Sequence, residues 1–288
     1  PSANRDDCRL LAVNRSSGDL SDTFFFHLPN FLKPGDLLVF NDVRVDKSRI
    51  YGKKASGSLH EVLLIQSSSD LKKWSAVAKK TRKLKKGDQL FFPGQISAFL
   101  TDDPQNGKIS LLFSEPLTET LLDLIGEIPL PPYIRGKRNH EKSDEIFYQT
   151  VFAKEGGAKA APTAGLHFSE NLLNQLGEAG IQSARVRLFV SLGTFEPIKS
   201  EYVEDHEIHE EEYLIEDSQA QLINQAIKEK RRIIAVGTTV VRTLESAFHE
   251  NRVIPGRQKT RIFITPGYEF KVINALITNF HTPYSTLL

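Results

Sequence analysis

Short runs in which apolar and polar residues alternate dominate the stretch from Arg49 to Phe113. Gly, Asp or Ser residues separate these runs. Alternation with a period of two is typical of half-buried strands, and closely spaced strands with no helix between them favour a small antiparallel barrel or sandwich. The predicted strands cover residues 50–51, 61–65, 74–78, 89–92, 96–100 and 108–113.

The pattern on either side of this stretch mixes strand-like runs with segments of helical period. We expect strands at 9–13, 23–26, 37–40, 184–190, 232–236, 262–264 and 272–278, and helices at 117–125, 169–179, 219–230 and 239–249. Gly180 is expected to end the second helix, and Ser218 with Gln221 forms a capping-box pattern at the start of the third. This order predicts a mixed α/β fold: a discontinuous α/β catalytic domain, 1–49 and 131–288, with a small antiparallel β-barrel inserted at 50–130.

Composition narrows the class of protein without naming a function. The 288 residues are 40% hydrophobic and 25% charged, which is ordinary for a globular protein. No apolar run approaches the roughly 20 residues that cross a bilayer, so we expect no membrane association and a cytoplasmic location. Cys8 is the only cysteine, which excludes an intramolecular disulfide and argues against a thiolate metal site.

The stretch Ala160–Phe168 carries the clearest candidate chemistry. It consists mainly of small residues, lies directly before a predicted helix and contains His167. A histidine in this setting can act as a base or hydrogen-bond donor near neutral pH, beside the free N–H groups of a helix start. Thr163 and Gly165 would contact a ligand there. The alternative is a histidine that only caps the helix or satisfies the core.

Three further polar clusters stand at the ends of predicted strands, where α/β sheets bind ligands. Each also has a structural interpretation: Asp42 could be a buried base or an ion-pair partner of Arg44, the Gly237 turn could merely start a helix, and Arg242 with Glu245 could be a surface pair. A single glycine at 237 does not make a dinucleotide-binding motif. The candidates are Asn41, Asp42 and Arg44; Gly237, Thr238, Thr239, Arg242 and Glu245; and Asn279 with His281.

His206 and His209 have a spacing found in metal sites, and Glu210–Glu212 follow them. The neighbouring sequence supplies no convincing third and fourth ligand, so we predict no metal site. Substrate contact or acid–base work is the preferred interpretation of this pair.

The net charge of +1 hides an uneven distribution. Residues 79–86 include six basic side chains in eight positions, whereas residues 201–212 include seven acids. Such a run is most often a solvated hairpin, but it can also follow a phosphate backbone. Trp74, Phe91 and Phe92 near it are expected in the barrel core.

Five of these segments occur in the order seen in one enzyme family. From about Arg9 to Leu288 the chain resembles the S-adenosylmethionine:tRNA ribosyltransferase-isomerases of queuosine biosynthesis. The motifs that carry the resemblance are 40–45, 130–134, 160–168, 235–245 and 278–288.

The resemblance implies transfer and isomerisation of the ribosyl group of S-adenosylmethionine onto 7-aminomethyl-7-deazaguanine at the tRNA wobble position, giving epoxyqueuosine, adenine and methionine. It implies S-adenosylmethionine as a cosubstrate, no permanently bound cofactor and tRNA as a partner. The oligomeric state does not follow from the sequence, and a monomer is our expectation. The catalytic candidates are then His167, Asp42 and His206. It also gives weight to tRNA binding by Lys80, Arg82 and Lys83.

The chain departs from the family pattern at Asp46–Ser48, where Ile-Pro-Ala is usual, and at Tyr284, where arginine is usual. The sequence contains no methionine, and the family has segments before Arg9 and after Leu288, so we expect a partial chain or uncounted modified methionines. Two rivals remain: a non-catalytic tRNA-binding protein, and another S-adenosylmethionine-dependent tRNA-modifying transferase. A methyltransferase predicts a glycine-rich loop after the first strand, and none is evident.

Overall fold

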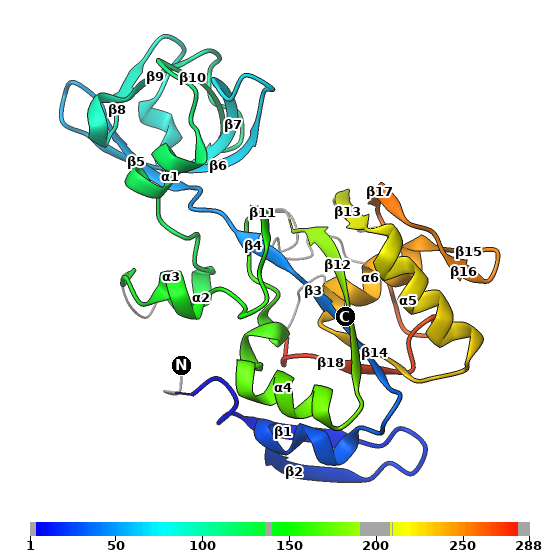
Figure 1. Ribbon diagram of the computed structural model, residues 1–288. Helices are drawn as coiled ribbons and strands as arrows, with labels where there is room; N and C mark the ends of the chain where they lie inside the picture. Colours follow the sequence, from blue (N-terminus) through cyan, green and yellow to red (C-terminus); the bar gives the residue numbers. More distant parts are fainter. Residues whose placement is uncertain (1–3, 136–139, 191–207, 209, 282–288) are drawn as a thin grey trace. The chain divides into compact units, whose positions relative to one another are not determined.

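The computed structural model describes residues 4–135, 140–190, 208 and 210–281. The chain forms two compact units, one from the residues up to Arg44 and from Phe147 onwards, the other from Val45 to Ile146. The first is built on a mixed sheet with helices, and the second contains a closed barrel (Figure 1). The predicted fold class, mixed α/β with an antiparallel barrel, is confirmed. The predicted domain boundaries at 49/50 and 130/131 stay predictions.

The barrel closes in the order β10–β7–β6–β5–β8–β9, and all its neighbouring strands are antiparallel. Alternate residues of each strand point into one apolar core, as the sequence pattern requires. Trp74 and Phe92 lie in that core, but Phe91 is exposed, so its predicted burial is wrong: consecutive strand residues face opposite sides. The strands are β5 (Arg49–Lys53), β6 (Leu59–Ser67), β7 (Lys73–Ala78), β8 (Gln89–Phe91), β9 (Ser97–Leu100) and β10 (Lys108–Phe113).

The first unit is organised by a six-stranded sheet in the order β17–β13–β12–β3–β14–β18. Strands β12, β3, β14 and β18 are parallel, and β13 and β17 extend one edge in antiparallel pairing. The carboxyl ends of the four parallel strands therefore lie along the same edge. The strands are β3 (Leu37–Asn41), β12 (Gln182–Phe189), β13 (Glu211–Ile215), β14 (Ile233–Val236), β17 (Gly256–Thr260) and β18 (Ala275–Ile277).

Both faces of this sheet are covered, which explains why β3 is buried along its whole length. Leu37 and Val39 pack with α5 (Asp217–Lys228) and α6 (Thr238–Ala247) on one face. Leu38 and Phe40 pack on the other face with the 3-10 helix η1 (Phe25–Phe31) and with α4 (Glu170–Glu178).

The remaining elements are short. Among the described helices, none is long and apolar enough to cross a membrane. These elements are β1 (Arg9–Val13), β2 (Leu20–Phe24), β4 (Val43–Val45), η2 (Thr81–Lys83), η3 (Pro93–Gln95), α1 (Glu119–Ile125), α2 (Pro132–Arg135), α3 (Asp144–Phe147), β11 (Glu155–Ala158), η4 (Thr163–His167), β15 (Phe248–His249) and β16 (Arg252–Val253).

Two predicted details are wrong. Helix α5 begins at Asp217, and no side chain caps it, so Ser218 and Gln221 form no capping box. Its N-cap residue, Glu216, instead forms an ion pair with Arg187 at 2.9 Å. The strand expected at 262–264 is replaced by β17, because the polar segment Gly256–Thr260 pairs with β13 at the sheet edge.

Candidate functional site

The small-residue segment folds into the 3-10 helix η4, which ends at His167 and leads into α4. A hydrogen bond from Gly165 N to Pro162 O, 2.8 Å long, makes the tight turn. A methyl group on Gly165 would lie 2.9 Å from the ring of Phe152, so a larger residue here would require that ring to move. The N-cap of α4 is Ser169, whose hydroxyl accepts from Leu172 N at 3.1 Å. His167 is therefore not the helix cap.

The imidazole of His167 is held from both sides. Its Nε2 lies 2.7 Å from Nδ2 of Asn279, which follows β18, and its Nδ1 lies 3.1 Å from Sγ of Cys8. The ring of Phe25 lies beside it, with 5.5 Å between ring centroids. The structure thus brings together two predicted site residues that are 112 positions apart. It adds Cys8, which sequence reasoning used only to argue about disulfides and metals.

Burial controls the protonation of this group. Loss of solvation lowers the pKa of His167; a backbone hydrogen bond with Arg5 works against this shift, and the charge of Arg5 adds to it. Burial likewise raises the pKa of the Cys8 thiol. Both shifts favour a neutral imidazole beside a protonated thiol, and a neutral imidazole is the form that can accept a proton.

The loop after β14 approaches the same segment. Gly237 has a φ of +94°, and a methyl group on it would lie 3.8 Å from Cβ of Ala164 in η4. Helix α6 begins at Thr238 without a side-chain cap, so its first N–H groups lack that partner. Within the described part of the chain, Thr239 Oγ1 and Asn279 Oδ1 are buried and form no hydrogen bond. Buried polar atoms without partners are rare in proteins, and these two belong to adjoining segments of the candidate site.

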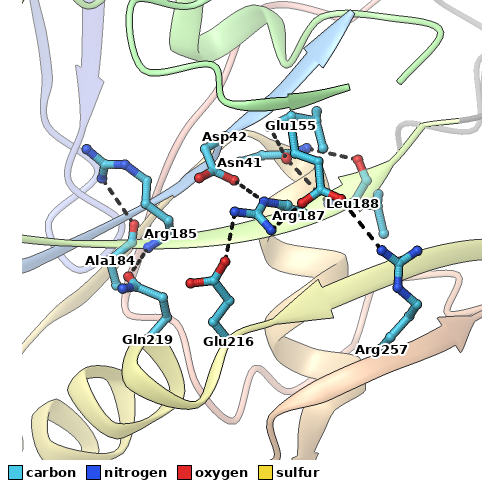
Figure 2. A network of polar contacts seen from close by, with 11 residues as sticks. Asn41, Asp42, Glu155, Ala184, Arg185, Arg187, Leu188, Glu216, Gln219 and Arg257 are labelled. Atoms are coloured by element: carbon cyan, nitrogen blue, oxygen red, sulfur yellow. Dashed lines mark hydrogen bonds and ion pairs between the residues drawn. The ribbon is translucent and has the colours of Figure 1, made fainter. Parts of the chain in front are cut away.

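Asp42 belongs to a second polar cluster, which follows β3 and is shown in Figure 2. Its carboxylate is buried and accepts from Nε of Arg187 in β12 at 3.0 Å. The possible pairing with Arg44 is therefore wrong, because strand β12 places Arg187 against Asp42. Burial raises the pKa of Asp42, and the charge of Arg187 opposes that shift.

Arg187 is the centre of this cluster, since it also pairs with Glu155 at 2.6 Å and Glu216 at 2.9 Å. Asn41 is buried beside it, and its amide bonds to the backbone of Leu188 in both directions, at 3.2 and 3.3 Å. Asn41 therefore holds the end of β3 against the backbone of β12. A small pocket adjoins the cluster and is lined by Asp42, Lys154, Arg185, Val186, Arg187, Leu214, Glu216 and Gln219.

Comparison with known proteins shows the family of this chain. The model of a family described as queuosine biosynthesis protein matches residues 1–288. The chain belongs to this family. It is 42% identical over 289 residues to the S-adenosylmethionine:tRNA ribosyltransferase-isomerase of Carboxydothermus hydrogenoformans, covering 100% of this chain and 84% of that protein.

Other relatives and one solved structure carry similar names. The S-adenosylmethionine:tRNA ribosyltransferase-isomerase of Fusobacterium nucleatum is 42% identical, with 100% of this chain and 82% of that protein covered. A solved structure of S-adenosylmethionine tRNA ribosyltransferase from Thermotoga maritima is 29% identical and covers 100% of this chain and 82% of that one, with a TM-score of 0.48. The predicted membership of the queuosine biosynthesis family is confirmed.

In this family member, Arg242 and Glu245 of α6 are not a surface pair. Both are buried, and Arg242 binds Glu211 of β13, a strand that reaches it only through the tertiary fold. Glu245 accepts from the backbone N–H groups of residues 271–273 at 2.9–3.3 Å and from the hydroxyl of Tyr268 at 3.2 Å. It therefore anchors the segment that leads into β18 and Asn279.

The other candidates are placed as follows. His281 Nε2 lies 3.2 Å from the hydroxyl of Thr278. Thr163 and Thr238 begin η4 and α6. His206, His209 and Tyr284 lie outside the described residues. Among the residues that are described, no group of three or more His, Cys, Asp or Glu could hold a metal ion.

The basic run lies on the barrel, after β7. Lys80, Arg82 and Lys83 are exposed in and next to η2. Leu84, within the same run, is buried in the barrel core. Lys79 pairs with Glu61 at 3.2 Å. The departure at Asp46–Ser48 introduces Lys47, which pairs with Glu145 at 2.9 Å within the same unit.

Proposed function

We propose that this chain transfers and isomerises the ribosyl group of S-adenosylmethionine onto 7-aminomethyl-7-deazaguanine in the tRNA anticodon, releasing adenine and methionine and leaving epoxyqueuosine. The observation that supports it best is the imidazole of His167, held between Asn279 and Cys8 beside the carboxyl ends of β14 and β18. Family membership and the names of relatives 40–42% identical support the same reaction.

The chemistry needs a base beside the sulfonium of S-adenosylmethionine. The positive sulfur acidifies the neighbouring C–H, so a neutral imidazole suffices to remove the proton, and the resulting imidazolium can protonate a leaving group. His167 is our candidate for this role, with Asp42 and His206 as alternatives. Asp42 is a weaker candidate than His167, because Arg187 already binds its carboxylate.

The remaining site residues would bind and orient the substrates. The uncapped start of α6 favours an anion such as the methionine carboxylate, and the hydroxyls of Thr238 and Thr239 can bind a ribose or that carboxylate. The exposed cations Lys80, Arg82 and Lys83 would contact tRNA phosphates. No permanently bound cofactor is needed. We also propose that the protein is monomeric and cytoplasmic.

The test is incubation of the protein with S-adenosylmethionine and tRNA that carries the precursor base, followed by measurement of free adenine and methionine. Equal amounts of both products are expected. Formation of S-adenosylhomocysteine would instead establish a methyltransferase, and tRNA binding without adenine release would establish a non-catalytic binding protein.

A further inference from the structure

The segment that precedes β1 lies along η4 and the start of α4. Arg5 Nη1 donates to the carbonyl of Leu166 at 3.2 Å, and Asp6 accepts from the hydroxyl of Ser169 at 2.6 Å. Backbone hydrogen bonds from Phe26 N to Asp6 O and from Phe25 N to Cys8 O, 3.1 and 2.8 Å long, fix this segment to η1. These backbone hydrogen bonds place Cys8 without its thiol and without the side chain of Asp6.

The two partners of His167 together select a tautomer. Asn279 presents Nδ2, a donor, at 2.7 Å from Nε2, so Nε2 accepts and carries no proton. A neutral imidazole must then carry its proton on Nδ1, where the Cys8 sulfur lies at 3.1 Å and accepts it. Burial disfavours a thiolate–imidazolium pair, because it raises the pKa of the thiol and lowers that of the imidazole.

We propose that Cys8 is a positioning residue for His167: its sulfur accepts the Nδ1 proton and leaves Nε2, on the side of Asn279, as the nitrogen that takes up the substrate proton. Asn279 Nδ2 occupies this nitrogen before substrate binds, and its buried Oδ1, which has no partner in the described part of the chain, is left for a substrate N–H or O–H. The role in proton transfer rests on the proposed function, whereas the tautomer does not.

The first test is independent of activity. In ¹⁵N NMR spectra of the full chain, with His167 assigned by comparison with His167→Ala, the wild-type imidazole is expected in a single neutral tautomer with Nδ1 protonated. Cys8→Ser keeps a hydrogen-bond acceptor and should keep this tautomer. In Cys8→Ala the proton on Nδ1 loses its acceptor, and the amide of Asn279 can rotate to present Oδ1 to a protonated Nε2, so a mixture of tautomers is expected. A wild-type spectrum with Nε2 protonated, or an unchanged Cys8→Ala spectrum, overturns the proposal.

The second test separates positioning from folding. Groups that hydrogen-bond to metal-bound histidines and orient them contribute about 10- to 100-fold to activity. We expect an effect at the low end of this range here: Cys8→Ala should lower kcat for adenine release by about tenfold with little change in KM, and Cys8→Ser should recover most of the loss. Asp6→Ala is the matched control, since it removes the contact with Ser169 and leaves the thiol in place; it should lower stability and spare kcat.

An unchanged kcat in Cys8→Ala, or an equal loss of kcat in Asp6→Ala, overturns the positioning role. If the wild-type protein releases no adenine, the proposed function fails, while the NMR experiment still decides the tautomer.

Discussion

His167 shows how the chemistry of one side chain depends on residues far away in the sequence. Its imidazole is half-buried and is bound on one nitrogen by Asn279 and on the other by Cys8. Capping does not explain it, because Ser169 is the N-cap of α4.

Replacement of His167 by alanine tests its role directly. We expect His167→Ala to fold and retain most of its tRNA affinity, but to lose about 100- to 10,000-fold in adenine release, as loss of general acid–base help does. His249, exposed in β15, supplies the control, and His249→Ala should retain its activity. A His167→Ala protein that melts early but turns over within a few-fold of wild type would make the histidine structural and shift attention to Asp42 and His206.

The pH profile provides a second prediction for the same side chain. Burial lowers the pKa of His167 from 6.5, so the neutral, proton-accepting form persists to lower pH than for a solvated histidine. The acidic limb of kcat/KM should therefore have its midpoint below pH 6.5. A midpoint above that value would contradict the assignment of His167 as the base of the free enzyme.

At the level of elements, strand β12 connects several parts of the first unit through one side chain. Arg187 binds Asp42 after β3, Glu155 of β11 and Glu216 before α5, and its own side chain is 12% exposed. Gln219 of α5 also accepts from the backbone of Arg185 at 2.7 Å. The start of α5 is thus determined by contacts with β12 and not by a local capping motif.

Arg187→Met should lower the free energy of unfolding by about 3–5 kcal/mol, because it leaves the buried carboxylate of Asp42 without its partner. Arg257→Met is the control: Arg257 is half-exposed and pairs with Glu212, so its loss should cost about 1 kcal/mol or less. Urea denaturation of the two variants measures both values. Equal, small losses would show that Arg187 does not hold Asp42.

At the scale of the whole molecule, the two units carry different candidate functions. The polar strand ends and His167 belong to the unit with the mixed sheet, and the exposed basic run belongs to the barrel. In the proposed function, the basic run of the barrel contributes to tRNA affinity and the sheet edge of the first unit to the chemistry.

Combined replacement of Lys80, Arg82 and Lys83 by alanine should weaken tRNA binding and reduce its salt dependence. Each lost phosphate contact lowers the slope of log K against log salt by about 0.7–0.9, so a change of about 2–3 is expected. Replacing Lys228, Lys230 and Arg252, exposed in the other unit, removes the same charge and should leave the slope nearly unchanged. An unaltered slope in the first variant would mean that the run is only a solvated surface.

Activity should survive exhaustive chelation. The proposed chemistry uses imidazole and the acidity conferred by the sulfonium, and the spacing of His206 and His209 lacks convincing further ligands in the sequence. The measurement is adenine release before and after dialysis against a chelator. Loss of activity that zinc restores would make the two histidines metal ligands.

The sequence by itself determined the kinds of element and the segments that carry chemistry. Alternation along residues 49–113 predicts the barrel because the period of two is a local property of strands. The small residues of 160–168 and the polar ends of 37–40 and 232–236 likewise point to the sheet edge without knowledge of any contact.

Only the tertiary structure decided which side chains meet. Asp42 pairs with Arg187, 145 positions away, and His167 with Cys8, 159 positions away, because strand order and connections bring these segments together. The same holds for Arg242, which binds Glu211, and for the edge strand β17, whose polar residues give no strand signal. Periodicity states which face of an element is buried, but the partner on that face is selected by the packing of distant segments.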